Sequence, residues 1–250
     1  MDRTLTSRFE RKYLVSSHVA DQIRHMVAPH LQHDPFSVNA VGNRYSVCSL
    51  YFDNQELFLY NQTKNSEKNR YKLRVRSYGD AATDDLFFEV KKRLNQVVRK
   101  DRSAVGRAEG RKIIDAINSG RPVGSITDNA ALNNFLHLSK ESSALPNLRV
   151  RYMREAFESR TADPVRVTFD TDLMTCPSPN AELSAGEGDW VRVPDRGVIL
   201  EVKYSGDPPP WVQNMMEVFH LTNQSVPKYI LSVENTPHLS HVARQQYGTA

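Results

Sequence analysis

Three segments of this sequence place a glutamate and a lysine two residues apart, and these pairs are its clearest candidates for chemistry. They are Glu10/Lys12, Glu89/Lys91 and Glu201/Lys203. Side chains alternate between the two faces of a β-strand, so residues two apart share a face. One such pair is weak evidence, because surface strands often pair opposite charges. Its recurrence in three predicted strands points to a shared charged face.

Basic residues recur on the same faces. In residues 70–78 the even positions are mostly basic and the odd positions are mostly apolar, which is the two-residue period of a strand. The cations on this and other predicted strands are Lys72, Arg74, Arg76, Lys100, Arg102, Arg149, Arg166 and Lys228. If these faces converge inside a closed barrel, cations outnumber acids there. Uncompensated buried charge is costly, so such an interior needs water and an anion.

The implied anion is multivalent and extended, because the cations are spread over many strands. A phosphate chain fits, since arginine offers paired donors and lysine a mobile point charge. The few acids on these faces then suit a divalent cation, which prefers carboxylates together with phosphate oxygens. Glu201 and Glu10 are the better metal candidates, whereas Glu89 could orient Lys91 and Asp170 could pair with an arginine.

The elements that must position these residues are mostly strands. Period-two patterns predict strands at residues 8–15, 45–53, 70–78, 87–93, 97–103, 147–157, 164–173, 197–204 and 228–234. Helical spacing predicts helices near 17–31, 107–118, 128–138 and 211–221. Residues 70–103 are expected to form an antiparallel meander with clustered cations. The pattern as a whole favours an α+β fold.

Composition sets wider limits. The 250 residues carry a formal net charge of +4 and an ordinary globular share of hydrophobic residues, 39%. We expect one domain over 1–250, with a core of about 7–234 and a C-terminal tail over 236–250. Cys48 and Cys176 give neither metal spacing nor a disulfide framework, which favours a reducing compartment. No signal peptide and no membrane-spanning run is evident, so a cytoplasmic location is expected.

Several motifs stand in colinear order over roughly residues 7–234. They are Ser-Arg-Phe-Glu-Arg-Lys-Tyr at 7–13, Ser-Leu-Tyr-Phe-Asp-Asn at 49–54, Lys-Leu-Arg-Val-Arg-Ser-Tyr-Gly at 72–79, Phe-Glu-Val-Lys at 88–91, Leu-Arg-Val-Arg-Tyr-Met-Arg-Glu-Ala-Phe at 148–157, Arg-Val-Thr-Phe-Asp at 166–170 and Leu-Glu-Val-Lys-Tyr at 200–204. Together they resemble the VTC domain, the polyphosphate polymerase module of the vacuolar transporter chaperone complex, within the triphosphate tunnel (CYTH-like) superfamily.

The resemblance implies an antiparallel β-barrel, a triphosphate tunnel lined by basic residues with flanking helices. It also implies transfer of the γ-phosphoryl group of ATP to a growing inorganic polyphosphate chain, with Mn²⁺ or Mg²⁺. The candidate catalytic residues are Lys12, Arg74, Arg76, Lys91 and Lys228. The candidate substrate-binding residues are Arg8, Lys72, Lys100, Arg102, Arg149, Arg151, Arg166 and Lys203. Glu201 and Glu10 are the candidate metal ligands.

Two alternatives stay open. One is hydrolysis of tripolyphosphate or a nucleoside triphosphate, although Arg8, where triphosphatases often have a glutamate, favours gripping phosphate. The other is a polyphosphate-binding module without catalysis. Nucleic acid is a poor partner, because the charged faces carry few interleaved aromatics. The end motif at 225–229 lacks one basic residue of the family pattern. Export of product would need a membrane partner.

Overall fold

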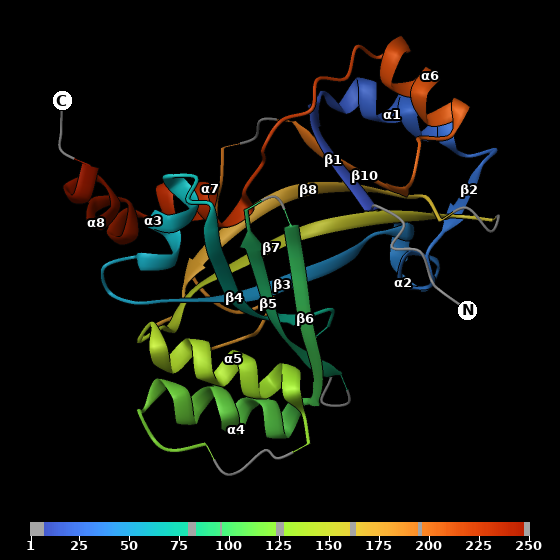
Figure 1. Ribbon diagram of the computed structural model, residues 1–250. Helices are drawn as coiled ribbons and strands as arrows, with labels where there is room; N and C mark the ends of the chain where they lie inside the picture. Colours follow the sequence, from blue (N-terminus) through green and yellow to red (C-terminus); the bar gives the residue numbers. More distant parts are fainter. Residues whose placement is uncertain are drawn as a thin grey trace. The chain divides into compact units, whose positions relative to one another are not determined.

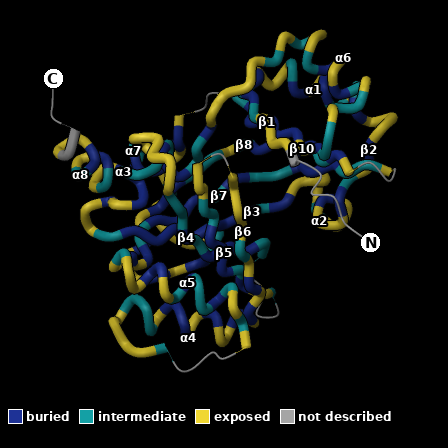
Figure 2. The backbone as a smooth tube through the Cα atoms, viewed as in Figure 1, coloured by how far each residue is buried: buried dark blue, intermediate teal, exposed yellow. Residues whose placement is uncertain are grey.

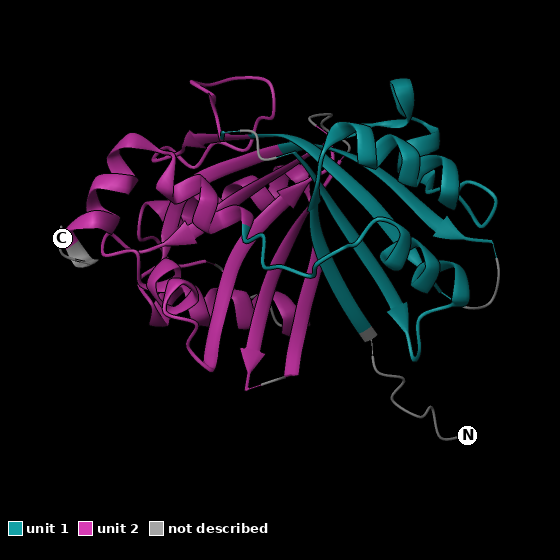
Figure 3. Ribbon diagram, turned by 90° about the horizontal axis from the view of Figure 1, so that it is seen from above, with its two compact units in different colours: residues 1–45, 152–173, 194–227 teal, residues 46–151, 174–193, 228–250 magenta. Residues whose placement is uncertain are grey.

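The computed structural model describes residues 8–79, 84–95, 97–123, 128–160, 164–194 and 197–247, with the side chains of residues 8, 246 and 247 excepted (Figure 1). The chain divides into two compact units, coloured separately in Figure 3. Unit 1 consists of Met1–Tyr45, Tyr152–Leu173 and Pro194–Pro227, and unit 2 of Ser46–Arg151, Met174–Val193 and Lys228–Ala250. A single domain over 1–250 stays a prediction.

Unit 1 is built on a sheet in which β1 (Arg8–Val15) pairs with β10 (Val198–Ser205), and β10 pairs with β8 (Arg166–Pro177). The short β2 (Leu31–His33) pairs with the distal part of β7 (Leu145–Ser159). Its helices are α1 (Ser17–Val27), α2 (Pro35–Val38), the 3-10 turn η1 (Val41–Asn43) and α6 (Pro210–Val218).

The helices of unit 1 cover one face of that sheet and leave the other to polar residues. Ser16 caps α1 by accepting a hydrogen bond from the Val19 amide, as its place before the helix predicts. Buried residues of α1 and α6, including Ile23 and Met215, share a core with Tyr13 and Leu200 of the paired strands. Tyr13 and Leu200 lie opposite each other across β1 and β10. The neighbouring positions Lys12 and Glu201 therefore face away from this core.

Unit 2 carries the meander expected from the sequence. β3 (Tyr45–Asp53), β4 (Asn69–Ser77), β5 (Asp85–Leu94) and β6 (Val97–Gly106) follow one another in antiparallel order, and β9 (Val191–Arg192) pairs with β8. Its helices are α3 (Phe58–Lys64), α4 (Arg107–Asn118), α5 (Ala130–Glu141), α7 (Lys228–Glu234) and α8 (Pro237–Tyr247). Helices α4 and α5 lie against the meander (Figure 1).

The predicted fold class is confirmed: the strands form an antiparallel sheet with flanking helices. One predicted strand is wrong, because residues 228–234 form the helix α7. The buried positions of that segment, Tyr229, Ile230, Ser232 and Val233, have helical spacing, which seven residues do not separate clearly from alternation. No helix in the described ranges is both long and apolar enough to span a bilayer.

The apolar core of unit 2 centres on three phenylalanines. The Phe135 ring, which is fully buried, meets the rings of Phe52 and Phe88 edge-on, with centroids 5.2 Å away in both cases. Such edge-to-face contacts stabilise a core beyond the burial of their area. They tie α5 to β3 and β5, the strands that carry the charged residues on their other face.

We predict that Phe135→Ala lowers the free energy of unfolding by about 3–5 kcal/mol, because it removes a buried ring and leaves a cavity. Urea unfolding followed by circular dichroism measures the change. Phe58→Ala is the matched control, since the Phe58 side chain is 43% exposed, and it should cost far less. Equal losses in the two variants would contradict this assignment of the core.

Candidate functional site

The register of β4, β5 and β6 builds a charged face on unit 2. In one row Arg74 pairs with Glu89, which pairs with Arg102. In the next row Lys72 pairs with Lys91, which pairs with Lys100. Like charges directly opposite each other destabilise a sheet. We call these six residues, together with Arg76, the basic face, and its cations outnumber its one acid, Glu89.

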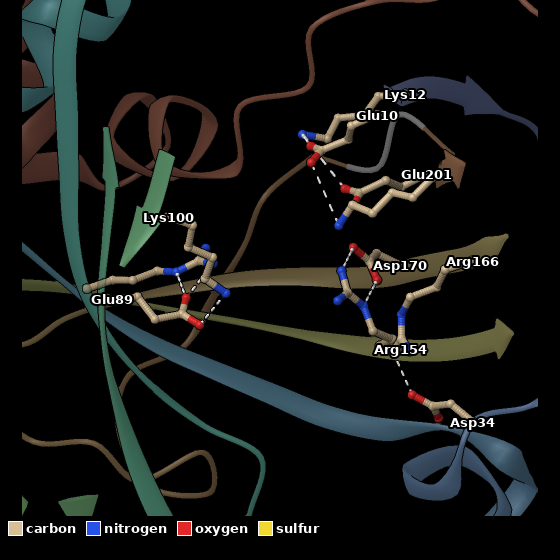
Figure 4. Close-up of polar contacts among 11 residues, drawn as sticks. Glu10, Lys12, Asp34, Glu89, Lys100, Arg154, Arg166, Asp170 and Glu201 are labelled. Atoms are coloured by element: carbon tan, nitrogen blue, oxygen red, sulfur yellow. Dashed lines mark hydrogen bonds and ion pairs between the residues drawn. The ribbon is translucent and has the colours of Figure 1, made fainter. Parts of the chain in front are cut away.

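Glu89 is the acid at the centre of the basic face, and its residue is only 1% exposed. Its carboxylate lies 2.6 Å from the Lys100 Nζ (Figure 4). It also lies 2.7 Å from Arg74 and 3.5 Å from the Arg102 Nε. Burial alone would raise the pKa of Glu89. Arg74, Arg76 and Lys100 outweigh burial and hold that pKa well below its ordinary value of 4.5. The carboxylate therefore orders several cations but cannot neutralise them all.

The pKa values of two nearby tyrosines are lowered by cations of the basic face. Burial would raise the pKa of the Tyr51 hydroxyl, yet Arg74, Arg76 and Lys228 together lower it. The pKa of Tyr78 is lowered in the same way, against burial, by Arg76 and Arg102. Tyr51 also accepts a hydrogen bond of 3.1 Å from Arg74. The surroundings of both rings favour negative charge.

Helix α7 begins at this face through a contact that the sequence did not reveal. The Tyr229 hydroxyl donates to the Asp53 carboxylate at 2.7 Å, and the Tyr229 ring stacks on Tyr51 with centroids 4.7 Å apart. Asp53 also accepts from the amides of Leu59 and Tyr60. Lys228, the first residue of α7, is thereby held where its charge acts on Tyr51. Alternation already placed Tyr51 and Asp53 on one strand face, but nothing paired them with residue 229.

Arg149 and Arg151 point into a loop of unit 2. The buried Arg149 guanidinium donates to the carbonyl oxygens of Ser184 and Glu187 at 2.8 and 2.9 Å. Arg151 lies over the Trp190 ring, 4.4 Å from its centroid. Gly188 has a φ of 122° and passes so close to Arg149 that a Cβ there would collide with the guanidinium. These contacts organise the loop, and a phosphate-binding role for the two arginines stays a prediction.

Unit 1 carries a second charged face, on which acids and bases balance. Lys12 pairs with Glu201 across β1 and β10, and Glu10 pairs with Lys203. The Lys12 Nζ lies 2.5 Å from Glu10 and 3.7 Å from Glu201. The Lys203 Nζ lies 3.7 Å from Glu10 and also forms an ion pair with Glu201 (Figure 4). Both lysines thus bridge the two carboxylates.

Two further pairs of opposite charge involve residues of β7 and β8 in unit 1. Arg154 grips Asp170 through two hydrogen bonds of 2.7 and 2.8 Å, and Arg166 lies 2.6 Å from Asp34. Asp170 is therefore an arginine partner in this structure. The side chain of Arg8 lies outside the described residues. Sequence reasoning missed Arg154 as a member of the face, although its spacing from Arg149 shows that the two point to opposite sides of β7.

The carboxylates on the charged face of unit 1 suit a divalent cation only if phosphate oxygens of a substrate complete its ligands. Within the described ranges, no three side chains among His, Cys, Asp and Glu come together as a metal-binding group. Glu10 and Glu201 supply two carboxylates, and Thr168 lies opposite Glu201 in the register. The Thr168 hydroxyl is buried and has no hydrogen-bond partner in the part of the chain that the structure describes. Mg²⁺ commonly binds through one or two carboxylates plus phosphate oxygens, and this set suits that mode.

Comparisons with known proteins agree on one family. A family model described as the VTC domain matches residues 7–236. Vacuolar transporter chaperone complex subunit 4 of Schizosaccharomyces pombe is 24% identical over 266 residues, which cover 87% of this chain and 35% of that protein. The chain thus spans about a third of the curated relative it matches.

Solved structures share the fold at low identity. A putative adenylyl cyclase from Hippeastrum, described as having a dominant triphosphatase activity, gives a TM-score of 0.50 at 14% identity over 89% of this chain and 93% of that one. A putative adenylate cyclase from Bacillus halodurans gives a TM-score of 0.49 at 14% identity over 89% and 94%. The Hippeastrum protein supports the fold assignment.

We predict that Glu89→Gln lowers the free energy of unfolding at neutral pH by about 1–3 kcal/mol, because cations lose their shared anion. The folded pKa of Glu89 lies below its unfolded value, so its stabilisation is present above about pH 4.5 and is lost as the pH falls further. The difference in the free energy of unfolding between wild type and Glu89→Gln should therefore become smaller as the pH falls. Urea titrations at several pH values measure it.

Glu109→Gln is the control, since Glu109 is exposed on α4 and its removal should change stability by less than about 0.5 kcal/mol. If the loss of unfolding free energy in Glu89→Gln does not change with pH, the cations do not hold the Glu89 carboxylate ionised.

Proposed function

This chain belongs to the VTC domain family, and from that premise we propose that it transfers the γ-phosphoryl group of ATP to a growing inorganic polyphosphate chain. The observation that carries the proposal is the gathering of Lys72, Lys91 and Lys100 on one sheet face with Arg74 and Arg102, around the buried Glu89. A repeated polyanion neutralises a row of cations better than one small anion does. Export of the product is assigned to a membrane partner, and a cytoplasmic location is part of the proposal because both cysteines are free.

Phosphoryl transfer asks little covalent chemistry of a protein, and alignment with charge neutralisation supplies most of the catalysis. Arg74 and Arg76 are the proposed grip on the triphosphate, because guanidinium groups bind phosphate oxygens through paired donors. Arg74 is ordered by Glu89, and Arg76 donates to the Ser49 hydroxyl at 3.3 Å. The lysines, with more mobile point charges, can follow a chain that moves. Lys228 completes the set from α7.

On unit 1, Glu10 and Glu201 are the proposed ligands for Mn²⁺ or Mg²⁺, with Lys12 and Lys203 beside them. The bound cation would neutralise charge on the bridging phosphate oxygens. The two lysines hold the carboxylates close together until phosphate binds. Phosphate oxygens can then take over the lysine ammonium groups as partners.

Incubation of the protein with ATP and Mn²⁺, followed by gel separation of the products, tests the proposal. Long phosphate chains support it. ADP with orthophosphate and no chains would identify a triphosphatase instead. Tight binding of tripolyphosphate without turnover would identify a binding module.

We predict that Lys91→Met lowers the rate of chain synthesis without lowering the stability of the fold. The variant removes a cation that faces two others, so the free energy of unfolding should stay the same or rise by a few tenths of a kcal/mol, about the size of a cross-strand pair effect. Chain synthesis should fall about 100-fold, as when one preorganised charge is removed from a site. Lys112→Met on the exposed side of α4 is the control and should leave both quantities unchanged. Full activity in Lys91→Met would remove the lysine row from the mechanism.

We predict that Glu201→Gln weakens binding of Mn²⁺ to the protein–tripolyphosphate complex by at least about tenfold, because one of two charged ligands is lost. Isothermal titration calorimetry measures this without turnover. Glu217→Gln on α6, where Glu217 is exposed, should bind Mn²⁺ like wild type. Unchanged affinity in Glu201→Gln would place the cation elsewhere.

A further inference from the structure

Three exposed apolar side chains flank the turn between β5 and β6. Leu94 is 44% exposed, Val97 68% and Val98 53%. Figure 2 shows much of β6 in the colour of exposed residues. Leu94 pairs directly with Val97, and Val98 pairs with Arg93 in the next row. We call Leu94, Val97 and Val98 the apolar tip. It shows apolar groups on both faces of the hairpin, because Val97 and Val98 point to opposite sides.

Cations lie beside and behind this tip. Arg93 lies opposite both Val98 and Arg70, in the second row of the tip, and one row further back Lys92 lies opposite Arg99. We call Arg70, Lys92, Arg93 and Arg99 the cationic collar. The Arg99 side chain is 75% exposed and pairs with Asp101 at 3.1 Å, while Arg93 donates to the Asn95 carbonyl oxygen at 2.8 Å. The four cations of the collar exceed the charge of Asp101 and of Glu67, the acid that acts on Arg70.

The spacing of tip and collar matches a membrane interface. Lys92 and Arg99 lie two rows behind Leu94 and Val97, a distance of about 7 Å along the strands. Apolar groups of interfacial segments enter a bilayer to a depth of about 5–10 Å, with cations remaining at the headgroups. A protein strand adding to β6 fits less well, because Arg99, Lys100 and Arg102 follow the tip along that strand and charged edges resist such pairing.

We propose that the apolar tip and the cationic collar form a docking site for an anionic lipid surface. Leu94, Val97 and Val98 enter the interface, and the collar contacts lipid phosphates and carboxylates. Neither group includes a residue of the basic face, so docking and phosphate binding use different side chains. The proposal does not depend on the polymerase activity.

Cosedimentation of the full chain with vesicles tests it, in saturating tripolyphosphate so that the basic face is occupied. We expect binding to phosphatidylcholine vesicles containing about one third phosphatidylserine and much weaker binding to phosphatidylcholine alone. Leu94→Ser/Val97→Ser and Lys92→Gln/Arg99→Gln should each lower the partition coefficient about tenfold. High salt should remove the collar's share of the binding.

Matched controls are Val41→Ser, at an apolar residue 99% exposed on unit 1, and Arg111→Gln/Lys112→Gln on the exposed side of α4. Both should bind like wild type, and unfolding curves check that every variant folds. The proposal is overturned if the protein fails to bind anionic vesicles, if tripolyphosphate abolishes binding, or if the controls lose as much as the tip and collar variants.

Discussion

The main physical constraint on unit 2 is that its strand register places lysines directly opposite one another. Sheet pairing forces Lys72, Lys91 and Lys100 into line, and the chain offers Glu89 as the nearby buried carboxylate. An apolar core behind the meander, including Phe88 and Phe135, holds the strands in place against this repulsion. Several cations therefore lie together on one sheet face, an arrangement that favours the binding of an anion. This arrangement is typical of functional sites, where local stability is given up for recognition.

The charged face of unit 1 differs from that of unit 2, because it carries acids and bases in equal number. Its charged face alternates acid and base, so Glu10, Lys12, Glu201 and Lys203 neutralise one another without a ligand. Arg154 and Asp170 do the same through a two-point contact. One face is therefore rich in cations, and the other holds two carboxylates close together between lysines. The two charge patterns suit the two proposed tasks, binding phosphate and binding a metal ion.

Much of this was predictable because strands carry their face assignments in a two-residue period. Arg74, Glu89 and Arg102 could be placed on one face from the sequence, since each lies in a clear alternating segment. Alternation does not tell which residues lie opposite across strands, so the lysine row could not be foreseen. The sequence predicts a strand at residues 228–234, where the structure has α7, because a segment of seven residues can fit both the helical and the strand period. Tyr229 with Asp53, and Arg149 with its loop carbonyls, depend on long-range packing that no local pattern encodes.

The contact between Tyr229 and Asp53 also bears on how the protein is made. These residues are 176 positions apart, yet the hydrogen bond and the stacked Tyr51 ring hold one side of the phosphate-binding surface. During synthesis the meander leaves the ribosome long before helix α7, so its cations lack this support until α7 has also been made. We therefore expect the nascent meander to expose its basic face to cellular polyanions until α7 packs beside Tyr51.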